Sequence, residues 1–351
     1  MDAFEYNGAP ARVIFGTGTV SKLAEEVARL GVTSPLLLST PGQFDNAKVL
    51  EDLLNGEVAG IFAEAIMHTP SSITEKALKY AKLTQADSII SIGGGSTIGL
   101  GKAISIRTGL PHICIPTTYS GSEMTPILGE TKDGKKSTRT DPKILPATVI
   151  YDVNLTMMLP TSTSAASGVN AIAHSGPPAF PVCKEPFEGI TALASSLPTI
   201  VSSQSSLPAR QKALYGAWLC GTCLGSVDMS IHHKLCHTLG GSFNMPHAET
   251  HTIILPHALA YNAPNIPEVM RSLAAALPGS DGDAIKGLNL LLEQLKVKRG
   301  LREFGFKEED VDKAADIALV NEYRNPRVVE RAPIRELLRR AWAGEPARAD
   351  L

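Results

Sequence analysis

The sequence predicts an N-terminal α/β domain, built on a parallel sheet with flanking helices, followed by an all-helical C-terminal domain. Its 351 residues exceed what one hydrophobic core usually holds, which favours two domains. Short runs of Ile, Val and Leu alternate with amphipathic stretches up to residue 150, whereas later residues are rich in Ala and Leu. We place the boundary near residue 155, which gives domains at 1–155 and 156–351.

Each expected strand of the first domain is a short apolar run, as in parallel sheets that are covered on both faces. The expected strands are RVIF (12–15), PLLLST (35–40), SIISI (88–92), HICIP (112–116) and ATVIYD (147–152), with helices at 18–30, 43–54 and 97–108. In the second domain, SSLPTIVSSQSSLPAR (195–210) contains two prolines and many serines. We therefore expect it to join two helices.

Composition excludes several classes of function. A formal net charge of -2 gives no general attraction to nucleic acid or to anionic membranes. The N-terminal MDAFEYNGAP lacks the basic residues of a signal peptide, and no apolar run is long enough to cross a bilayer, so we expect a cytoplasmic protein. Five cysteines favour reduced thiols. Cys220 and Cys223 form a CxxC pair inside a helical pattern, which favours core packing over a redox role.

A glycine-rich segment, IGGGST, follows one apolar strand and opens a helix. Such a turn presents backbone N–H groups and the positive end of a helix to a phosphate. It is not the common dinucleotide fingerprint, because Ile98 stands where a glycine is required, and it is not a P-loop, because Ser96 and Ala103 break that motif. A second polar turn, IPTTYSGSE (115–123), follows the next strand. Both turns are expected at the carboxyl edge of the sheet, which predicts a nucleotide-sized site.

Six of the nine histidines lie between residues 232 and 257. His233 and His237 are four residues apart, as are His247 and His251, so each pair is expected to share a helical face. This clustering favours a functional site, with metal binding and direct acid–base chemistry both open. A ligand set of Asn170, His174, His233 and His247 carries no negative charge, which should lower its affinity for iron or zinc. The imidazoles would otherwise act directly as hydrogen-bond donors and proton carriers.

Four stretches resemble the maleylacetate reductases of the iron-containing alcohol dehydrogenase-like superfamily. They are GVNAIAH, ALYGAWLCGTCLG, HHKLCHTLGG and MPHAETHTIILPHALAYNAP. The similarity runs from the IFGTGT opening to the NPRVV segment near the end of the chain. It implies the dehydroquinate synthase-like fold, with an α/β NAD(P)-binding domain, an all-helical catalytic domain and a homodimeric assembly.

The resemblance also implies an activity, the NAD(P)H-dependent reduction of 2-maleylacetate to 3-oxoadipate in aromatic compound degradation. Metal-dependent relatives bind their ion through one aspartate and three histidines, at positions that match Asn170, His174, His233 and His247. The reductases of this group typically have asparagine there and work without metal, so we expect none. The candidate catalytic residues are those four and His237.

The resemblance places the phosphates of NADH or NADPH on two segments, with candidates Gly93, Gly94, Gly95, Ser96, Thr117, Thr118, Ser120 and Ser122. NAD-selective relatives hold the ribose with an aspartate near the end of the second strand, where this chain has Ser39 and Thr40. Without that carboxylate nothing repels a 2′-phosphate, so either cofactor is acceptable. A dicarboxylate substrate needs cations or other donors, and the candidates, equally plausible as surface residues, are Arg139, Lys143, Tyr323, Arg324 and Arg327.

The sequence departs from the resembled family at one segment, and it leaves three alternative functions open. Where relatives continue a helix after His174, this chain has SGPPAFPVCKEP, and Pro177 and Pro178 should end the helix early. The main alternative function is a metal-dependent (Fe/Zn) alcohol dehydrogenase. The others are a non-redox lyase or cyclase related to 3-dehydroquinate synthase, and a nucleotide-binding protein without catalysis. In the favoured reading the partner is a small dicarboxylate, with no nucleic acid or membrane.

Overall fold

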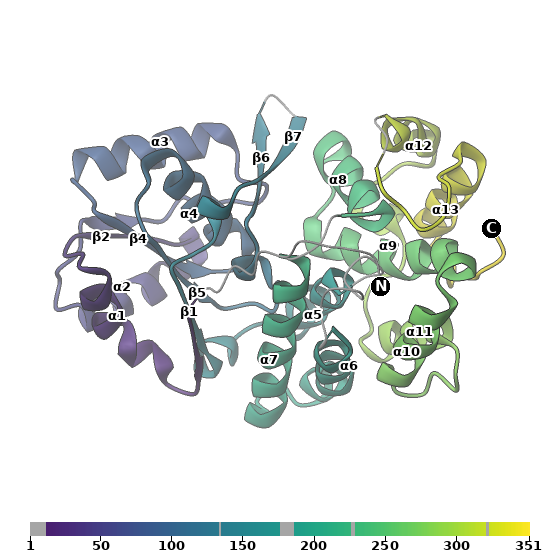
Figure 1. Cartoon of the computed structure of the whole chain (residues 1–351), viewed down its shortest axis with the longest axis horizontal. Helices are drawn as coiled ribbons and strands as arrows, with labels where there is room; N and C mark the ends of the chain where they lie inside the picture. Colours follow the sequence, from purple (N-terminus) through teal and green to yellow (C-terminus); the bar gives the residue numbers. More distant parts are fainter. Residues whose placement is uncertain (1–11, 133–134, 176–185, 226–228, 321–322) are drawn as a thin grey trace, which may run out of the picture. The chain divides into compact units, whose positions relative to one another are not determined.

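The computed structural model describes residues 12–132, 135–175, 186–225, 229–320 and 323–351 (Figure 1). The chain forms two compact units, each described by itself. The α/β unit comprises Met1–Pro116, Ser122–Glu130 and Thr138–Asp152. The helical unit comprises Thr117–Gly121, Thr131–Ser137 and Val153–Leu351. None of the helices in the described ranges has both the length and the apolar character needed to span a membrane.

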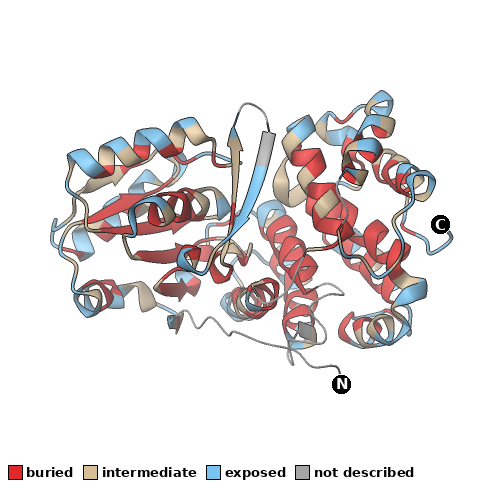
Figure 2. Ribbon diagram, turned by 45° about the horizontal axis from the view of Figure 1, so that its top comes forward, coloured by how far each residue is buried: buried red, intermediate tan, exposed pale blue. Residues whose placement is uncertain are grey.

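A six-stranded sheet forms the centre of the α/β unit, with strand order β1-β8-β5-β4-β2-β3. All neighbouring strands pair in parallel, which confirms the predicted sheet type. Every residue of β2, β4, β5 and β8 is buried, because helices cover both faces (Figure 2). The strands are β1 Arg12–Gly16, β2 Pro35–Leu38, β3 Gly60–Phe62, β4 Ser88–Gly93, β5 His112–Pro116 and β8 Thr148–Asp152.

The helices of the α/β unit follow the strands in the alternation that the sequence predicts. They are α1 Leu23–Leu30, α2 Phe44–Leu53, α3 Ser71–Leu83 and α4 Gly95–Thr108. Strand β3 and helix α3 were not among the predicted elements. Short 3-10 helices at Thr19–Lys22 and Pro41–Gln43 lead into α1 and α2. A separate two-stranded sheet, β6 Ile127–Lys132 with β7 Lys135–Thr140, was not predicted. Its sequence alternates weakly and is largely polar, so it lacks the apolar signal of a buried strand.

The second unit is helical, as predicted. Its helices are α5 Thr161–His174, α6 Pro186–Ser202, α7 Leu207–Leu224, α8 Ile231–Phe243, α9 His247–Asn262, α10 Pro267–Ala276, α11 Ala284–Gln294, α12 Val311–Leu319 and α13 Arg331–Ala343. The residues of α5 from Ser164 to His174 and those of α9 from Thr250 to Asn262 are all buried. Helices that are buried all round form the interior of a helical domain, and these two carry His174, His247 and His251, which are discussed below.

The expected connection at 195–210 is wrong in its extent. Helix α6 continues through Pro198 to Ser202, so only residues 203–206 separate it from α7. The serines did not break the helix because their hydroxyls donate to carbonyls one turn earlier, as Ser195 does to Thr191 and Ser196 to Ala192, both at 2.6 Å. The apolar side chains of this helix, among them Ile190, Leu193 and Leu197, are buried, and their packing outweighs the proline's missing N–H.

Helix α5 ends at His174, before the two prolines, as the sequence predicts. The proline-containing segment itself, with Cys183, lies outside the described residues. The four cysteines within them are buried, and Cys220 and Cys223 lie on α7. A Cβ at Gly189 of α6 would lie 2.8 Å from Cys220 Sγ, so this thiol fills the contact between two helices.

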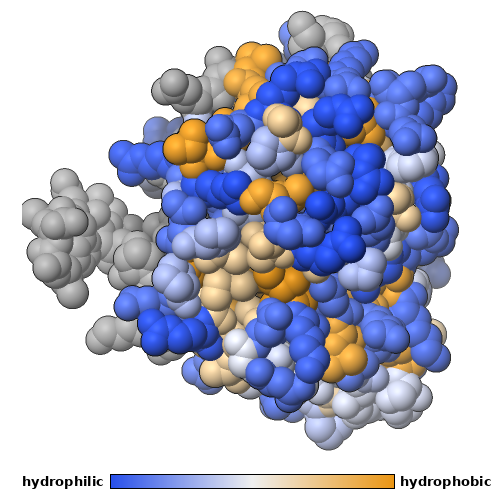
Figure 3. All heavy atoms as spheres, turned by 90° about the vertical axis from the view of Figure 1, so that its right-hand side faces the viewer, coloured by the Kyte–Doolittle hydropathy of each residue, from blue (hydrophilic) through white to orange (hydrophobic). Residues whose placement is uncertain are grey.

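The outer face of the C-terminal helices is mostly hydrophilic, with hydrophobic side chains in small separate groups (Figure 3). Arg331 bridges Asp316 at 2.6 Å, and Arg335 bridges Asp312 at 2.8 Å, which links α13 to α12 across this surface. These pairs are about half exposed, and such pairs contribute little stability each. The buried side of α13 supplies the packing instead.

Candidate active site

The glycine turn forms the junction between β4 and α4. Gly93 has φ +149°, and a Cβ there would lie 2.6 Å from Thr97 Oγ1, so the position requires glycine. Gly95 is exposed, while Gly94 and Ser96 are half-buried. The first N–H groups of a helix have no partner within the helix and attract anions. The structure therefore brings the four predicted residues of this turn together in a form that suits a phosphate.

The second polar turn begins at the same edge of the sheet. Gly93 pairs with Pro116 of β5, so Thr117 leaves the sheet beside the glycine turn. The side chain of Tyr119 is fully buried, whereas Thr118 and Ser120 on either side of it are half-buried. Buried and half-buried residues thus alternate along the turn.

Strand β2 pairs with the other side of β4. Leu38, the last residue of β2, is opposite Ser91, and Ser39 and Thr40 follow it. Ser39 is fully buried, and Thr40 is half-buried and precedes the short helix that leads into α2. The predicted ribose-side residues thus leave the sheet at the edge where the glycine turn begins.

Three helices of the helical unit bring the predicted asparagine and histidines into one group. Asn170 and His174 lie one turn apart on α5 and are both buried. The ring of His174 is 5.7 Å from that of His233 on α8, and His233 is 6.2 Å from His237 on the same helix. His247 opens α9, and it is half-buried like His237.

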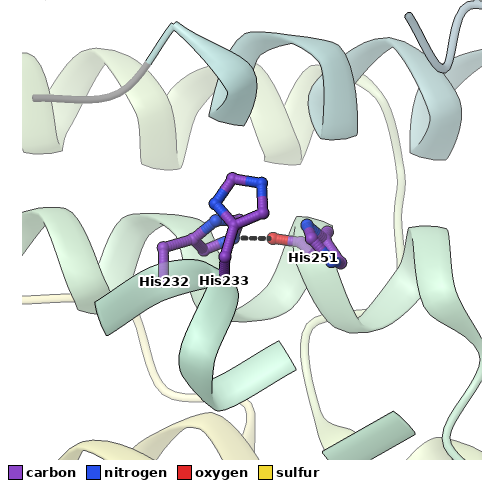
Figure 4. Close-up of side chains that lie close together, drawn as sticks. All are labelled: His232, His233 and His251. Carbon is purple, nitrogen blue, oxygen red and sulfur yellow. Dashed lines mark hydrogen bonds between the residues drawn. The ribbon is translucent and has the colours of Figure 1, made fainter. Parts of the chain in front are cut away.

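His232 and His251 belong to the same group, although they were not among the predicted site residues. His232, His233 and His251 are all buried, and one potential ligand atom from each lies within 4.8 Å of the others (Figure 4). His232 Nε2 lies 3.0 Å from the backbone oxygen of His251, which makes it the protonated ring nitrogen. The sequence could have predicted both residues, because His251 is four residues after His247 and His232 adjoins His233.

Burial keeps the inner histidines uncharged. Desolvation lowers the pKa of His232 to about 4. It also holds the pKa values of His233 and His251 well below the usual range, and the surrounding imidazoles lower them further. All three are therefore neutral at pH 7. His237 and His247 stand at the half-buried edge of the group, where exchange with solvent is possible.

An apolar cavity adjoins three of these rings. It has a volume of about 50 Å³ and touches His174, His232 and His233. Its other walls are largely aliphatic, with Ile172, Ile190, Leu224, Leu255, Leu259 and Leu273 among them. Such walls exclude water and supply no counter-charge, which is the physical cause of the lowered pKa values.

The candidate substrate-binding residues include three exposed cations and one half-buried tyrosine. Arg139, on β7, is exposed and pairs with Asp141 at 3.0 Å, and Lys143 is exposed on a short 3-10 helix. Arg324 is exposed, and Tyr323 is half-buried with Lys234 Nζ 5.5 Å from its ring centre. Their part in substrate binding stays a prediction.

Arg327 is engaged within the protein. It donates to the Tyr261 carbonyl at 3.0 Å, and its guanidinium lies 4.4 Å from the centre of the Tyr261 ring. These contacts give it a structural role in the helical unit.

Comparison with known families accounts for both units. The model of the iron-containing alcohol dehydrogenases matches residues 10–153, and the C-terminal model of the Fe-containing alcohol dehydrogenase family matches residues 164–342. The chain belongs to the iron-containing alcohol dehydrogenase family. It is an oxidoreductase, and enzymes of this family generally use nicotinamide cofactors.

Individual relatives confirm the resemblance and the predicted fold class. The maleylacetate reductase of Rhizobium sp. (strain MTP-10005) is 47% identical over 350 residues, which cover 98% of this chain and 99% of that protein. The crystal structure of the maleylacetate reductase of Agrobacterium tumefaciens is 45% identical, with a TM-score of 0.91, and covers 99% of this chain and 100% of its own. An iron-containing alcohol dehydrogenase from Corynebacterium glutamicum is 38% identical, with a TM-score of 0.89, over 100% of this chain and 98% of its own.

The family's name raises the question of whether these residues suit iron. Asn170 Nδ2 lies 3.5 Å from the Ser120 carbonyl, and Asn170 Oδ1 is buried with no hydrogen-bond partner among the described residues. That oxygen and three imidazoles would be four neutral donors. Fe²⁺ or Zn²⁺ would gain no compensating negative charge from them. The ligand set at Asn170, His174, His233 and His247 therefore fits a divalent ion less well than a set that includes a carboxylate.

Proposed function

We propose that the chain reduces the carbon–carbon double bond of 2-maleylacetate to give 3-oxoadipate, with NADH or NADPH as hydride donor and without a metal. The observation that carries this proposal is the neutral donor set, in which Asn170 adjoins a group of imidazoles. The relatives named maleylacetate reductase, at 47% and 45% identity over nearly the whole chain, support the substrate.

The reaction needs one hydride and one proton. A bound nicotinamide would supply the hydride to the alkene carbon farther from the ketone, and the electron pair of the double bond would move toward the ketone oxygen to form an enolate. The alkene carbon next to the ketone then takes a proton, leaving 3-oxoadipate and the oxidised nucleotide. A hydrogen-bond donor aimed at the enolate oxygen lowers the barrier, by about 3 kcal/mol for one well-placed donor.

The histidines divide between these two tasks. His233 Nε2 is buried without a hydrogen-bond partner among the described residues, so as an N–H it is available to the ketone oxygen. The lowered pKa of His233 makes it a neutral donor. Half-buried His237 and His247 are better suited to supply the proton, because they can be reprotonated from solvent.

The cofactor is assigned to the turns of the sheet edge. The glycine turn Gly93–Ser96 would hold the phosphates with Thr117, Thr118, Ser120 and Ser122, and Ser39 and Thr40 would lie toward the ribose. Neither residue after β2 is acidic, which is why both nucleotides belong to the proposal. A homodimer and a cytoplasmic location are part of the same proposal and are open to light scattering and cell fractionation.

The decisive experiment follows NADH and NADPH oxidation spectrophotometrically, with maleylacetate as substrate and chelator-treated, metal-analysed protein. We expect one nucleotide oxidised per substrate, 3-oxoadipate as product and unchanged turnover in the chelator. Loss of turnover in the chelator, with recovery on adding Zn²⁺ or Fe²⁺, would contradict metal independence. An absence of nucleotide oxidation would contradict the proposed reaction.

One observation favours the alternative of a metal-dependent alcohol dehydrogenase. His232, His233 and His251 approach within 4.8 Å, and three imidazoles with an open fourth position form catalytic zinc sites in other enzymes. This alternative predicts stoichiometric metal in the purified protein and oxidation of simple alcohols that stops when the metal is removed.

A further inference from the structure

The turn Thr117–Gly121 follows a strand of the α/β unit but belongs to the helical unit. The N–H of Tyr119 donates to Ser167 Oγ of α5 at 3.3 Å. Gly121 lies against Gly221 of α7, where a Cβ on Gly121 would be 3.1 Å from Gly221 Cα. Two helices that are distant in sequence therefore fix the path of a five-residue turn.

Arg210 of α7 makes the most unusual of these attachments. Its side chain is fully buried, and the guanidinium donates to four oxygens at 3.0 to 3.2 Å. The acceptors are the Tyr119 hydroxyl, Ser164 Oγ and the carbonyls of Leu159 and Gln204. All four are neutral, so the buried charge is held by hydrogen bonds without an ion-pair partner among them.

A buried cation of this kind is costly, and an apolar side chain of similar volume would usually serve stability as well. What an apolar side chain cannot do is fix a hydroxyl in place. The planar guanidinium orients the Tyr119 hydroxyl while also bonding α5 and the loop before it. The arrangement therefore sets the position of Tyr119 more than it adds to the core.

Fixing Tyr119 also fixes its two neighbours. With the tyrosine ring buried and its N–H bonded to Ser167, the backbone of half-buried Thr118 and Ser120 is held on both sides of Tyr119. These two, together with Thr117, are the residues of the turn that are assigned to the cofactor. Their placement depends on a guanidinium 91 residues further along the chain.

We propose that Arg210 and Tyr119 are positioning residues that hold the Thr117–Gly121 turn in the shape that binds the nicotinamide nucleotide. This inference rests on the proposed function, in which that turn contacts the cofactor. Arg210 itself is wholly buried and acts through Tyr119.

The test uses full-length Tyr119→Phe, Arg210→Met and the double variant, and it measures the NADH dissociation constant by fluorescence titration together with KM and kcat. Tyr119→Phe removes only one hydroxyl, so it remains informative if Arg210→Met fails to fold. Tyr261→Phe is the matched control, because Tyr261 is equally buried and its hydroxyl donates to Val328 O, away from the turn.

We expect each single variant to raise the NADH dissociation constant about tenfold, because the released turn must be ordered again when the nucleotide binds. The double variant should be little worse than Arg210→Met, because Arg210→Met already breaks the contact that Tyr119→Phe removes. At saturating NADH, kcat should stay within about threefold of the parent, which a general loss of folding would not give. Tyr261→Phe should bind NADH as the parent does.

Parent-like NADH binding by folded Tyr119→Phe, or an equal loss in Tyr261→Phe, would overturn the positioning role. If the unchanged protein bound neither NADH nor NADPH, the proposed function itself would fall, and this inference with it. Nucleotide binding by the unchanged protein therefore distinguishes failure of the proposed function from failure of the positioning role.

Discussion

The rings of His247 and His251 lie one turn apart on α9, with centroids 4.2 Å apart, although one side chain is half-buried and the other is inside the protein. His251 is in turn 5.1 Å from His233. The imidazoles therefore form a continuous row from the edge of the group to its interior. A proton that enters at the edge therefore has ring nitrogens beside it along this row.

Replacing the edge histidines should slow the chemical step. We expect His237→Gln or His247→Gln to lower kcat on the order of a hundredfold, because proton donation by a positioned imidazole contributes about that much. The KM for NADH should change little. Steady-state kinetics with maleylacetate measures both kcat and KM. The control is His257→Asn, because His257 lies on α9 like His247 but is not part of the histidine group. A kcat within a few-fold of the parent for both edge variants would exclude them as the acid.

Restoring a carboxylate at position 170 should create affinity for metal. Asn170→Asp adds a negative charge beside His174 and His233, so we expect it to retain zinc or iron through dialysis in near-equimolar amount, as measured by mass spectrometry of the metal content. The reductase activity should fall, because a carboxylate oxygen cannot donate to the Ser120 carbonyl as Asn170 Nδ2 does. Asn170→Ala is the control and should gain no metal. Equal metal content in the parent and Asn170→Asp would contradict the charge argument.

The residue after β2 should control the choice of nucleotide. We expect Thr40→Asp to lower kcat/KM for NADPH at least tenfold relative to NADH, since a carboxylate beside the 2′-phosphate repels it. Thr40 already precedes a short helix, a position where aspartate is well tolerated. Thr40→Asn is the neutral control of nearly equal size. If both variants shift the NADPH/NADH ratio equally, charge is not the cause.

The free energy of unfolding should fall as the pH is lowered, because several histidines are buried in their neutral form. Burial lowers the pKa of His257 to about 3, and Arg299 and Arg340 lower it further. The unfolded chain, with a histidine pKa near 6.5, therefore takes up the proton first. This contribution to stability is complete above about pH 6.5 and is lost as the pH falls toward about 3.

The measurement is the free energy of unfolding in urea at several pH values between about 4 and 6. Each such histidine adds about 1.4 kcal/mol per pH unit to the slope, and His257→Asn should remove that amount. An unchanged slope in His257→Asn would show that this side chain is protonated in the folded protein. His112 and His232, with pKa values lowered to about 3 and about 4, should account for part of the remaining slope.

The predictable part of the fold is the part in which local sequence and burial agree. The runs SIISI and HICIP are apolar throughout because helices cover both faces of the sheet, so their strands were evident. The hairpin of β6 and β7 was missed because its residues are largely polar. The serines and Pro198 of α6 suggest a break that tertiary packing overrides.

The site was predictable where it depends on spacing within one helix. A separation of four residues placed Asn170 beside His174 and His233 beside His237, and the structure has both pairs on shared faces. The attachment of Tyr119 to Arg210 joins residues that no local pattern connects. A contact that forms only when separate helices pack cannot be inferred from periodicity.

The approach of Gly121 to Gly221 has a consequence for protein engineering. A Cβ on Gly221 would lie 2.4 Å from the Gly121 oxygen, and Gly121 has φ +72°. Chimeras that exchange the first half of the chain between relatives would transplant one partner of this contact without the other. Crossover points chosen at Asp152 should therefore fail whenever the donor and recipient differ at these two positions, and co-transferring α7 should rescue them.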